Sequence, residues 1–340
     1  MWYTNIDNNC PEITLNSSKP EDINEDHHKN EHNEEGHDEE GHGELPGIEP
    51  ANLSNGEQLQ VIASTSIVAD IVAQVGGNRI ELTGLIPTGA DSHSFEASPQ
   101  DLIALNDAHV IFINGLHLEE ALDPILDSLD GGNPIVSVNV GVETIGLGQD
   151  GHSAQVHVDK DHAHEGVDPH TWFSIHAVEQ WVTNIEHVLS DLDRVNAEIF
   201  EENAQAYLAE LKILEEELDG MIAELPVEKR ILITDHAVLG YFAAEYEFKV
   251  VGTVIPSFST IAVPSTRELA ALQDQIKAEG VTAIFVGFSA NPAMIEQIAN
   301  DMGIQVVPIY TESLSNADGP AASYLEFIRY NAAVVVAALK

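Results

Sequence analysis

The segment SPQDLIALNDAHVIFING, residues 98–115, contains a complete helix-to-strand unit. Ser98 is suited to cap the helix, Pro99 to occupy its first position, and Asp101 stands three residues after the cap, as in a capping box. The segment HVIFING contains the continuous apolar run VIFI, which is typical of a parallel strand covered on both faces. This segment predicts an α/β fold.

The same order of elements returns in the second half of the chain. Residues 265–288, STRELAALQDQIKAEGVTAIFVGF, run from a capping box at Ser265 and Glu268 through an amphipathic helix to an apolar strand. Strand and helix patterns alternate around both segments, so we predict two similar lobes, each a parallel sheet flanked by helices. Two such lobes can hold a ligand in a cleft between them.

A long helical pattern stands between the two halves. Its apolar positions recur at helical spacing from about Arg194 to Leu225, which corresponds to roughly 45 Å of helix. We predict that this helix joins the lobes. The expected organisation is an acidic, disordered tail at 1–57, a first lobe at 58–192 with a histidine-rich loop at 150–165, a linking helix at 193–226 and a second lobe at 227–340.

The charge balance excludes whole classes of partner. The chain has 340 residues, of which 57 are Asp or Glu and 13 are Lys or Arg, and its formal net charge is −44. A surface this acidic argues against binding nucleic acid, whose phosphates need basic side chains, and against adhesion to anionic lipid. Self-repulsion of this size is tolerable where salt screens it, so a saline habitat is a reasonable hypothesis.

Cysteine content and hydropathy give further limits. Cys10 is the single cysteine, so an intrachain disulfide is excluded. No apolar run approaches the ~20 residues of a membrane span, and the run AAVVVAAL at 332–339 is interpreted as a buried terminal helix. The first residues lack the pattern of a signal peptide, and those before Cys10 do not resemble a lipoprotein processing site. We therefore expect that the chain is a mature or trimmed form, and the alternative is that Cys10 is incidental.

Nine of the 16 histidines stand in two short acidic tracts. They are His27, His28, His32, His37 and His42 in the first tract, and His152, His157, His162 and His164 in the second. Imidazole beside carboxylate suits zinc and other late divalent metals. Because the tracts contain almost nothing apolar, we interpret them as flexible segments that bind metal weakly as accessory sites. The alternative is a solvated linker without a role.

Four other potential ligands stand alone in predicted loops: His93, His170, His236 and Glu312. In open α/β sheets, ligands bind beyond the carboxyl ends of the strands. His236 and Glu312 directly follow predicted strands, and His93 follows a third. Three imidazoles and one carboxylate can form a tetrahedral zinc site, or a five-coordinate site if the carboxylate binds through both oxygens. Each of these residues taken alone is more often a capping or hydrogen-bonding residue.

Several stretches together resemble the solute-binding proteins of zinc and manganese ABC importers. They are VIASTSIVADIVAQVGG, GADSHSFEASPQDL, NGLHLEEAL, DPHTWF, DHAVLGYFAAEYEF, IYTESLS and YLEFIRYNAAVVVAAL, and they are spread over residues 58–340. The resemblance implies two lobes linked by one rigid backbone helix, with a single divalent metal bound between the lobes. Carried over residue by residue, it implies His93, His170, His236 and Glu312 as the metal ligands.

Two departures from the family pattern bear on the choice of metal. The third ligand position is His236 and not a carboxylate, and a nitrogen-rich site favours Zn²⁺ because Mn²⁺ prefers oxygen ligands. The fourth is Glu312 where many relatives have aspartate, which leaves its denticity open. Mn²⁺ is the alternative cargo. Since histidine must be neutral to bind metal, affinity is expected to weaken below about pH 6.5, the ordinary pKa of histidine.

The resemblance implies an extracytoplasmic receptor, in the periplasm or at the cell surface, with lipid anchoring of the precursor as one option. Such a receptor passes its metal to the transmembrane subunits of an ABC permease. We expect a monomer without enzymatic activity. A zinc hydrolase is the alternative from another class, but the sequence has no HExxH motif and no nucleophile elbow. A surface adhesin is a third alternative, which no sequence feature separates from metal capture.

Four remaining histidines receive structural roles. His109, His176 and His187 stand within regular strand or helix patterns, where packing is expected. His117 is expected at the surface or beside the ligands.

Overall fold

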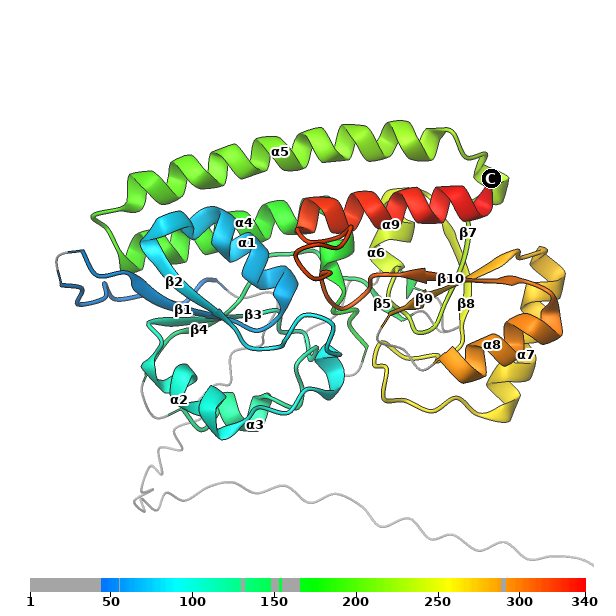
Figure 1. Ribbon diagram of the computed structural model, residues 1–340, viewed down its shortest axis with the longest axis horizontal. Coiled ribbons are helices and arrows are strands. Elements are labelled where there is room, and N and C mark those ends of the chain that lie inside the picture. Colours follow the sequence, from blue (N-terminus) through cyan, green and yellow to red (C-terminus); the bar gives the residue numbers. More distant parts are fainter. Residues whose placement is uncertain (1–43, 55, 130–131, 148–152, 155–165, 289–291) are drawn as a thin grey trace, which may run out of the picture. The chain divides into compact units, whose positions relative to one another are not determined.

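Two parallel sheets form the framework of the protein. The computed structural model describes residues 44–54, 56–129, 132–147, 153–154, 166–288 and 292–340. These residues belong to one compact unit, Asp38–Lys340. Each sheet has four strands with helices packed against it (Figure 1). The predicted α/β class is confirmed.

The first lobe is built on the sheet with strand order β2-β1-β3-β4. Its parallel strands are β1 (Leu59–Ala63), β2 (Ile80–Gly84), β3 (Val110–Ile113) and β4 (Ile135–Ser137). Helix α1 (Ser66–Gly76) packs on one face, and α2 (Pro99–Asp107) and the short α3 (Asp123–Leu126) pack on the other. The capping box at Ser98 and Asp101 is present, and all four residues of β3 are buried, as predicted.

The second lobe repeats this arrangement with the sheet order β10-β9-β7-β8. Its parallel strands are β7 (Ile231–Thr234), β8 (Lys249–Thr253), β9 (Ala283–Gly287) and β10 (Gln305–Ile309), and its helices include α6 (Gly240–Glu245), α7 (Thr266–Glu279) and α8 (Pro292–Met302). Counted along the chain within each lobe, both sheets place their strands in the order second, first, third, fourth. The prediction of two similar lobes is therefore confirmed.

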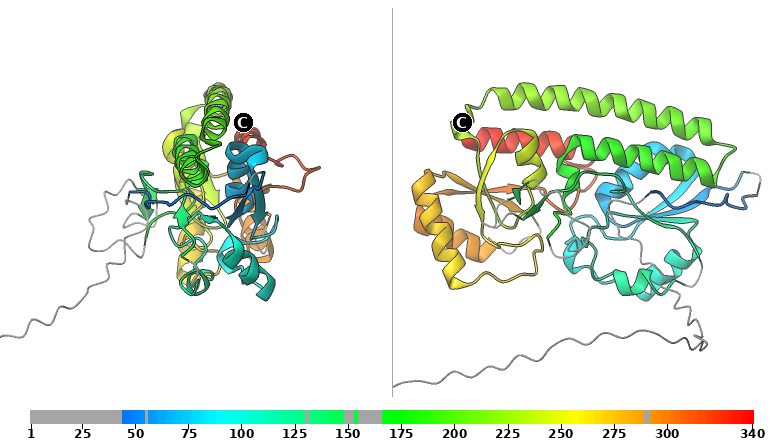
Figure 2. Two further views of the ribbon diagram at one scale, coloured as in Figure 1. Left: turned by 90° about the vertical axis from the view of Figure 1, so that its left-hand side faces the viewer. Right: turned by 180° about the vertical axis from the view of Figure 1, so that it is seen from behind.

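Helix α5 (Ala197–Ala223) is the predicted linking helix. Its 27 residues correspond to about 40 Å. Buried side chains recur along one face at Phe200, Ala204, Tyr207, Leu211, Leu214, Leu218 and Ile222. This face packs along α4 (Ile175–Leu192) and α9 (Tyr324–Leu339). Helix α5 spans both lobes, with α4 along the part over the first lobe and α9 along the part over the second (Figures 1 and 2). One hydrophobic core accordingly includes residues of both sheets.

Short elements complete the described part of the chain. They are the 3₁₀ turns η1 (Gly77–Arg79), η2 (Ser92–Ser94), η3 (Thr171–Phe173) and η4 (Val227–Lys229), and the antiparallel pair β5 (Gly146–Leu147) and β6 (Ser153–Ala154). Among the described helices, none is both long and apolar enough to cross a membrane.

The pattern of residues 118–129, LEEALDPILDSL, predicts a helix, but the structure reduces it to α3, Asp123–Leu126. The carboxylate of buried Glu119 accepts hydrogen bonds from the backbone N–H groups of Asn114 and Gly115. These bonds hold the chain in turns before α3. Leu116, two residues before the predicted segment, has a positive φ of 55°, so a right-handed helix cannot extend back through it.

The pattern of residues 236–247, HAVLGYFAAEYE, also predicts a helix, but the observed helix is shorter, because α6 begins only at Gly240. The backbone N–H of His236 donates to Asp235 Oδ1, and that of Ala237 donates to the carbonyl of Ser257. Hydrogen bonds to a side chain and to a distant carbonyl, and not those of a helix, thus hold the residues just after β7, where a candidate ligand stands.

The end of the predicted tail contacts the fold. Ile48 is buried in the main core, and the backbone N–H of Ala51 donates to the carbonyl of Leu192 at 2.9 Å. The tail predicted for 1–57 therefore includes residues that pack on the first lobe, because its last part carries the apolar side chains that the acidic part lacks. The remaining domain boundaries stay predictions.

Candidate metal centre

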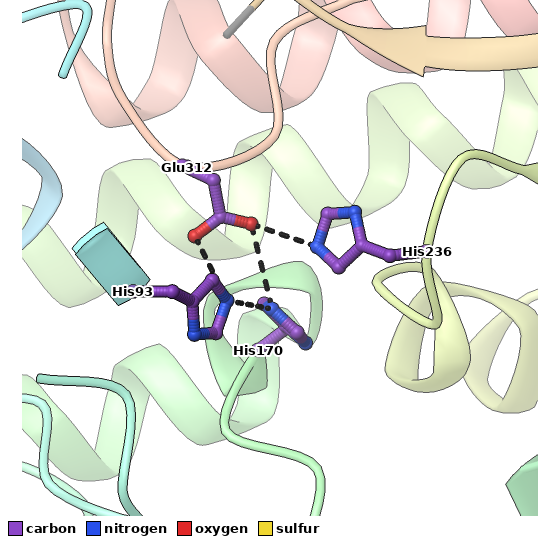
Figure 3. Close-up of side chains that lie close together, drawn as sticks. All are labelled: His93, His170, His236 and Glu312. Atoms are coloured by element: carbon purple, nitrogen blue, oxygen red, sulfur yellow. Dashed lines mark hydrogen bonds and ion pairs between the residues drawn. The ribbon is translucent and has the colours of Figure 1, made fainter. Parts of the chain in front are cut away.

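The four isolated residues singled out in the sequence lie together. One nitrogen from each of His93, His170 and His236 and one oxygen of Glu312 are all within 4.8 Å of one another (Figure 3). Their exposed fractions are 7%, 0%, 1% and 2%. His93 and His170 come from the first lobe, and His236 and Glu312 from loops directly after β7 and β10 of the second. Residues far apart in sequence thus form one buried cluster.

His93 stands on η2, in the loop that follows β2. Asp91 caps this turn, since its Oδ1 accepts a hydrogen bond from the His93 backbone N–H at 2.9 Å. The imidazole Nε2 lies 3.4 Å from Nε2 of His170 and 3.7 Å from Oε2 of Glu312. Nε2 of His93 is therefore the atom that faces the other three side chains (Figure 3).

His170 and His236 share a different arrangement. Nδ1 of His170 lies 2.7 Å from Asp168 Oδ1, and Nδ1 of His236 lies 3.0 Å from Asp235 Oδ1. The same carboxylate oxygens accept the backbone N–H groups of the two histidines. A carboxylate that accepts the Nδ1 proton fixes the ring and leaves the Nε2 lone pair free to bind a metal.

Glu312 joins the three imidazoles. Its Oε1 lies 3.4 Å from Nε2 of His170 and 3.1 Å from Nε2 of His236. Its Oε2 is buried and has no hydrogen-bond partner among the described residues. A buried carboxylate oxygen without a partner is costly. A divalent cation would satisfy it, and three nitrogens with one or two carboxylate oxygens are a donor set that such a cation accepts.

The electrostatics separate His93 from the other two histidines. Burial lowers the pKa of His93 to about 4, because the Glu312 carboxylate offsets it only in part. Burial also acts on His236, but Asp235 and Glu312 outweigh it and raise its pKa to about 10. The pKa of His170 is likewise raised, since Glu312 and Asp168 outweigh burial.

Glu312 is ionised under ordinary conditions. Burial acts to raise its pKa, but the imidazoles of His170 and His93 hold it well below the usual range. The pKa of about 10 for His236 therefore favours a protonated imidazole beside this carboxylate when no metal is bound. A metal that binds there has to replace that proton.

Asp168 and Asp235 are the functional residues that sequence reasoning missed. Each stands within two residues of a candidate ligand, in VDPH and TDH, and this adjacency is the signal that could have identified them. In a chain with 57 acidic residues, however, an aspartate beside a histidine is common by chance. Only the observed hydrogen bonds to Nδ1 distinguish these two.

The other histidines are distributed differently. All nine residues of the histidine tracts, His27, His28, His32, His37, His42, His152, His157, His162 and His164, lie outside the described residues. His176 and His187 are exposed beside carboxylates on helix surfaces, so the prediction that they pack was wrong. The apolar stripes of their helices face elsewhere.

His109 also differs from its expected packing role. Its Nδ1 accepts a hydrogen bond from the backbone N–H of Gln60 at 2.8 Å, which ties the starts of two neighbouring strands. His117 is exposed at the surface, in agreement with one of its two expected places.

Known proteins share both the sequence pattern and the fold. The model of the ZnuA family, described as "Zinc-uptake complex component A periplasmic", matches residues 61–338. The manganese-binding lipoprotein MntA of Halalkalibacterium halodurans is 27% identical over 286 residues, which is 84% of this chain and 90% of that protein.

Two solved structures extend the comparison. A Mn-bound periplasmic metal binding protein from Candidatus Liberibacter asiaticus is 27% identical with a TM-score of 0.72, covering 84% of this chain and 100% of that one. The periplasmic zinc binding protein TroA from Treponema pallidum is 25% identical with a TM-score of 0.72, covering 84% and 99%. The chain therefore belongs to the ZnuA family, the extracytoplasmic metal-binding receptors of ABC importers.

Proposed function

We propose that the protein is a high-affinity zinc receptor that holds one Zn²⁺ with His93, His170, His236 and Glu312 and delivers it to an ABC permease. The observation that carries this proposal is the convergence of three imidazole nitrogens and one carboxylate within 4.8 Å. Closed sites with four nitrogen, sulfur or oxygen ligands are typical of zinc that is held and not used in catalysis.

The ligand at position 236 favours zinc over manganese. With histidine there, nitrogen donors outnumber the carboxylate three to one, and imidazole suits Zn²⁺ better than it suits Mn²⁺. The support of His170 and His236 by Asp168 and Asp235 makes their Nε2 atoms better donors. Manganese is the alternative cargo, since MntA is named as manganese-binding.

Competition between the two ions tests the choice of metal. Protein stripped with a chelator would be titrated with Zn²⁺ and with Mn²⁺ in a calorimeter, and then with each ion in the presence of the other. One tight Zn²⁺ per chain that Mn²⁺ does not displace is expected. Tighter binding of Mn²⁺ would overturn the zinc assignment and leave the receptor assignment standing.

A matched pair of variants sharpens that test. His236→Glu adds an oxygen donor to the centre and is expected to shift the ratio of Zn²⁺ to Mn²⁺ affinity toward Mn²⁺. His187→Glu makes the same change at a histidine whose side chain is 59% exposed, and should leave the ratio unaltered. Equal ratios of Zn²⁺ to Mn²⁺ affinity in both variants would show that His236 is not a metal ligand.

The same donor set argues for a receptor and against a hydrolase. A catalytic zinc keeps an open position for water or substrate, whereas four protein ligands fill a tetrahedral zinc. All four side chains are more than nine-tenths buried, so transfer of the metal requires the loops around it to move. Turnover of an ester or peptide by the zinc-loaded protein would contradict this reading.

The histidine tracts are assigned an accessory role in this proposal. Removal of residues 150–165 is expected to lower the number of weakly bound Zn²⁺ ions and to leave the tight site intact, because none of the four ligands stands in that segment. Equilibrium dialysis at two zinc concentrations separates the two classes of site. Loss of the tight site in this deletion would show that its ligands are misassigned.

A further inference from the structure

One carboxylate connects the His93 loop to the opposite lobe. Asp91 Oδ1 accepts the backbone N–H of His93 at 2.9 Å, and Asp91 Oδ2 accepts a hydrogen bond from the hydroxyl of Thr260 at 2.7 Å. Thr260 belongs to the second lobe, in the loop between β8 and α7. The position of the His93 backbone is thereby linked to a residue 169 positions further along the chain.

A second contact ties the same loop to the second lobe. The backbone N–H of Gly89 donates to Ser313 Oγ at 2.7 Å, next to the candidate ligand Glu312. Each of the two contacts is one hydrogen bond that involves a polar side chain, and neither contact is itself an apolar one. Such bonds can open and close without disturbing either sheet.

His93 is the candidate ligand best placed to move. Its exposed fraction of 7% is the largest of the four, and the neighbouring side chains Thr88, Ser94 and Glu96 are exposed. His170 is held more firmly, because Asn114 at the end of β3 donates a hydrogen bond to the carbonyl of Pro169 just before it. A path to the buried centre therefore opens most easily at the His93 loop.

We propose that Asp91 and Thr260 form a latch that closes the His93 loop over the metal and sets the rate of metal release. This inference rests on the proposed function, since it takes His93 as a ligand. Thr260 acts as a positioning residue: its hydroxyl holds the Asp91 carboxylate, and that carboxylate holds His93 against the other ligands. A broken latch leaves all four ligands present but lets the loop open more often.

The test measures release and binding separately. Metal-loaded protein would be mixed with excess chelator in a stopped-flow instrument, for wild type, Thr260→Val and Thr260→Ser. Loss of a hydrogen bond to a charged group accelerates release in Thr260→Val on the order of tenfold. Thr260→Ser restores the hydroxyl and should release metal at close to the wild-type rate, while the association rate changes little in either variant.

Two controls keep the result interpretable. Thr282→Val makes the same change at an exposed threonine of the second lobe and should match wild type. Thr260→Ala carries the same prediction as Thr260→Val and replaces it if valine disturbs folding. The absorption spectrum of the Co²⁺-loaded variants should match wild type, since the four ligands remain in place.

The outcomes distinguish the latch from the proposed function. Release from Thr260→Val at the wild-type rate, or equally fast release from Thr260→Ser, would overturn the latch. Release is measured with whichever ion the wild type binds more tightly, Zn²⁺ or Mn²⁺. A wild type that binds manganese more tightly would thus change the proposed cargo and still test the latch.

Discussion

The centre contains two kinds of histidine, and they differ in what holds the ring. His170 and His236 each place Nδ1 against a buried aspartate, and both have raised pKa values. Among the described residues no carboxylate accepts a hydrogen bond from Nδ1 of His93, and burial lowers its pKa to about 4. His93 is held through its backbone, by Asp91.

This difference indicates that the histidines have separate roles in metal affinity and in metal exchange. Carboxylate-backed imidazoles are oriented in advance and are stronger donors, so His170 and His236 are expected to contribute most to affinity. His93 stands neutral and lies on the loop that two hydrogen bonds connect to the second lobe. It is therefore expected to govern exchange more than equilibrium binding.

The largest expected effect comes from removing one histidine of each kind. His236→Ala should weaken Zn²⁺ binding by more than about 100-fold, beyond the loss typical of a residue that only supports a ligand. His93→Ala should weaken it less and accelerate release, because the loop then closes without contributing a donor. Competition titration against a chelating dye gives both affinities. A greater loss of zinc affinity in His93→Ala than in His236→Ala would show that the aspartate-supported histidine is not the stronger donor.

Removing a supporting carboxylate should cost less than removing a ligand. Asp168→Asn keeps the size of the side chain but weakens the hydrogen bond to Nδ1 of His170, and a loss of roughly 10- to 100-fold in zinc affinity is expected. The melting temperature of the metal-free variant serves as the control for folding. Unchanged zinc affinity in a folded Asp168→Asn would show that the aspartate does not tune the metal site.

The pH dependence of binding follows from the raised pKa values. Because Asp235 and Glu312 raise the pKa of His236 to about 10, the metal-free site carries a proton there at neutral pH. Zinc must displace that proton, so affinity should rise by about tenfold per pH unit between pH 7 and 8. An ordinary histidine would give this dependence only below about pH 6.5.

Calorimetry can count the released protons. Zinc titrations at pH 7.5 in buffers of different ionisation enthalpy should show about one proton or more released per Zn²⁺ bound. His236→Ala should lower that number by about one. Zinc binding without proton release would mean that all three imidazoles are neutral beforehand, and the distinction between the two kinds of histidine would disappear.

The smallest expected effect concerns Tyr241. Its hydroxyl donates to the carbonyl of Asp168 at 2.8 Å and accepts the backbone N–H of Ile145. Tyr241→Phe should lower the free energy of unfolding by about 2 kcal/mol, because it removes both hydrogen bonds and each typically contributes about 1 kcal/mol, and it should alter zinc affinity only a few-fold. Denaturant titration and zinc competition measure the two quantities. A loss of affinity as large as that in Asp168→Asn would place Tyr241 among the residues that orient His170.

Local signals made much of the fold predictable. The capping boxes at Ser98 and Ser265 and the apolar strands after them use neighbouring residues only, and both appear in the structure as predicted. The helix predicted at 118–129 was too long because Glu119 is held by the backbone of residues that precede it. The spacing of apolar residues along the sequence carries no information about such a competing hydrogen bond.

The candidate ligands could be named from sequence because four potential ligands stand in predicted loops and because the motifs around them resemble those of a known family of metal receptors. What the sequence could not supply is how their surroundings differ. The split between a pKa of about 4 for His93 and about 10 for His236 depends on burial and on which carboxylates lie near each ring. The contact between Asp91 and Thr260 joins two lobes and has no local signature.

A zinc-loaded crystal structure with anomalous data at the zinc edge would show whether His93, His170, His236 and Glu312 bind one zinc ion. One strong anomalous peak is expected about 2.0–2.2 Å from Nε2 of His93, His170 and His236 and from a carboxylate oxygen of Glu312. A single zinc ion coordinated by other residues, or one that lies beyond bonding distance of His236 or Glu312, would show that these four residues are not the zinc ligands.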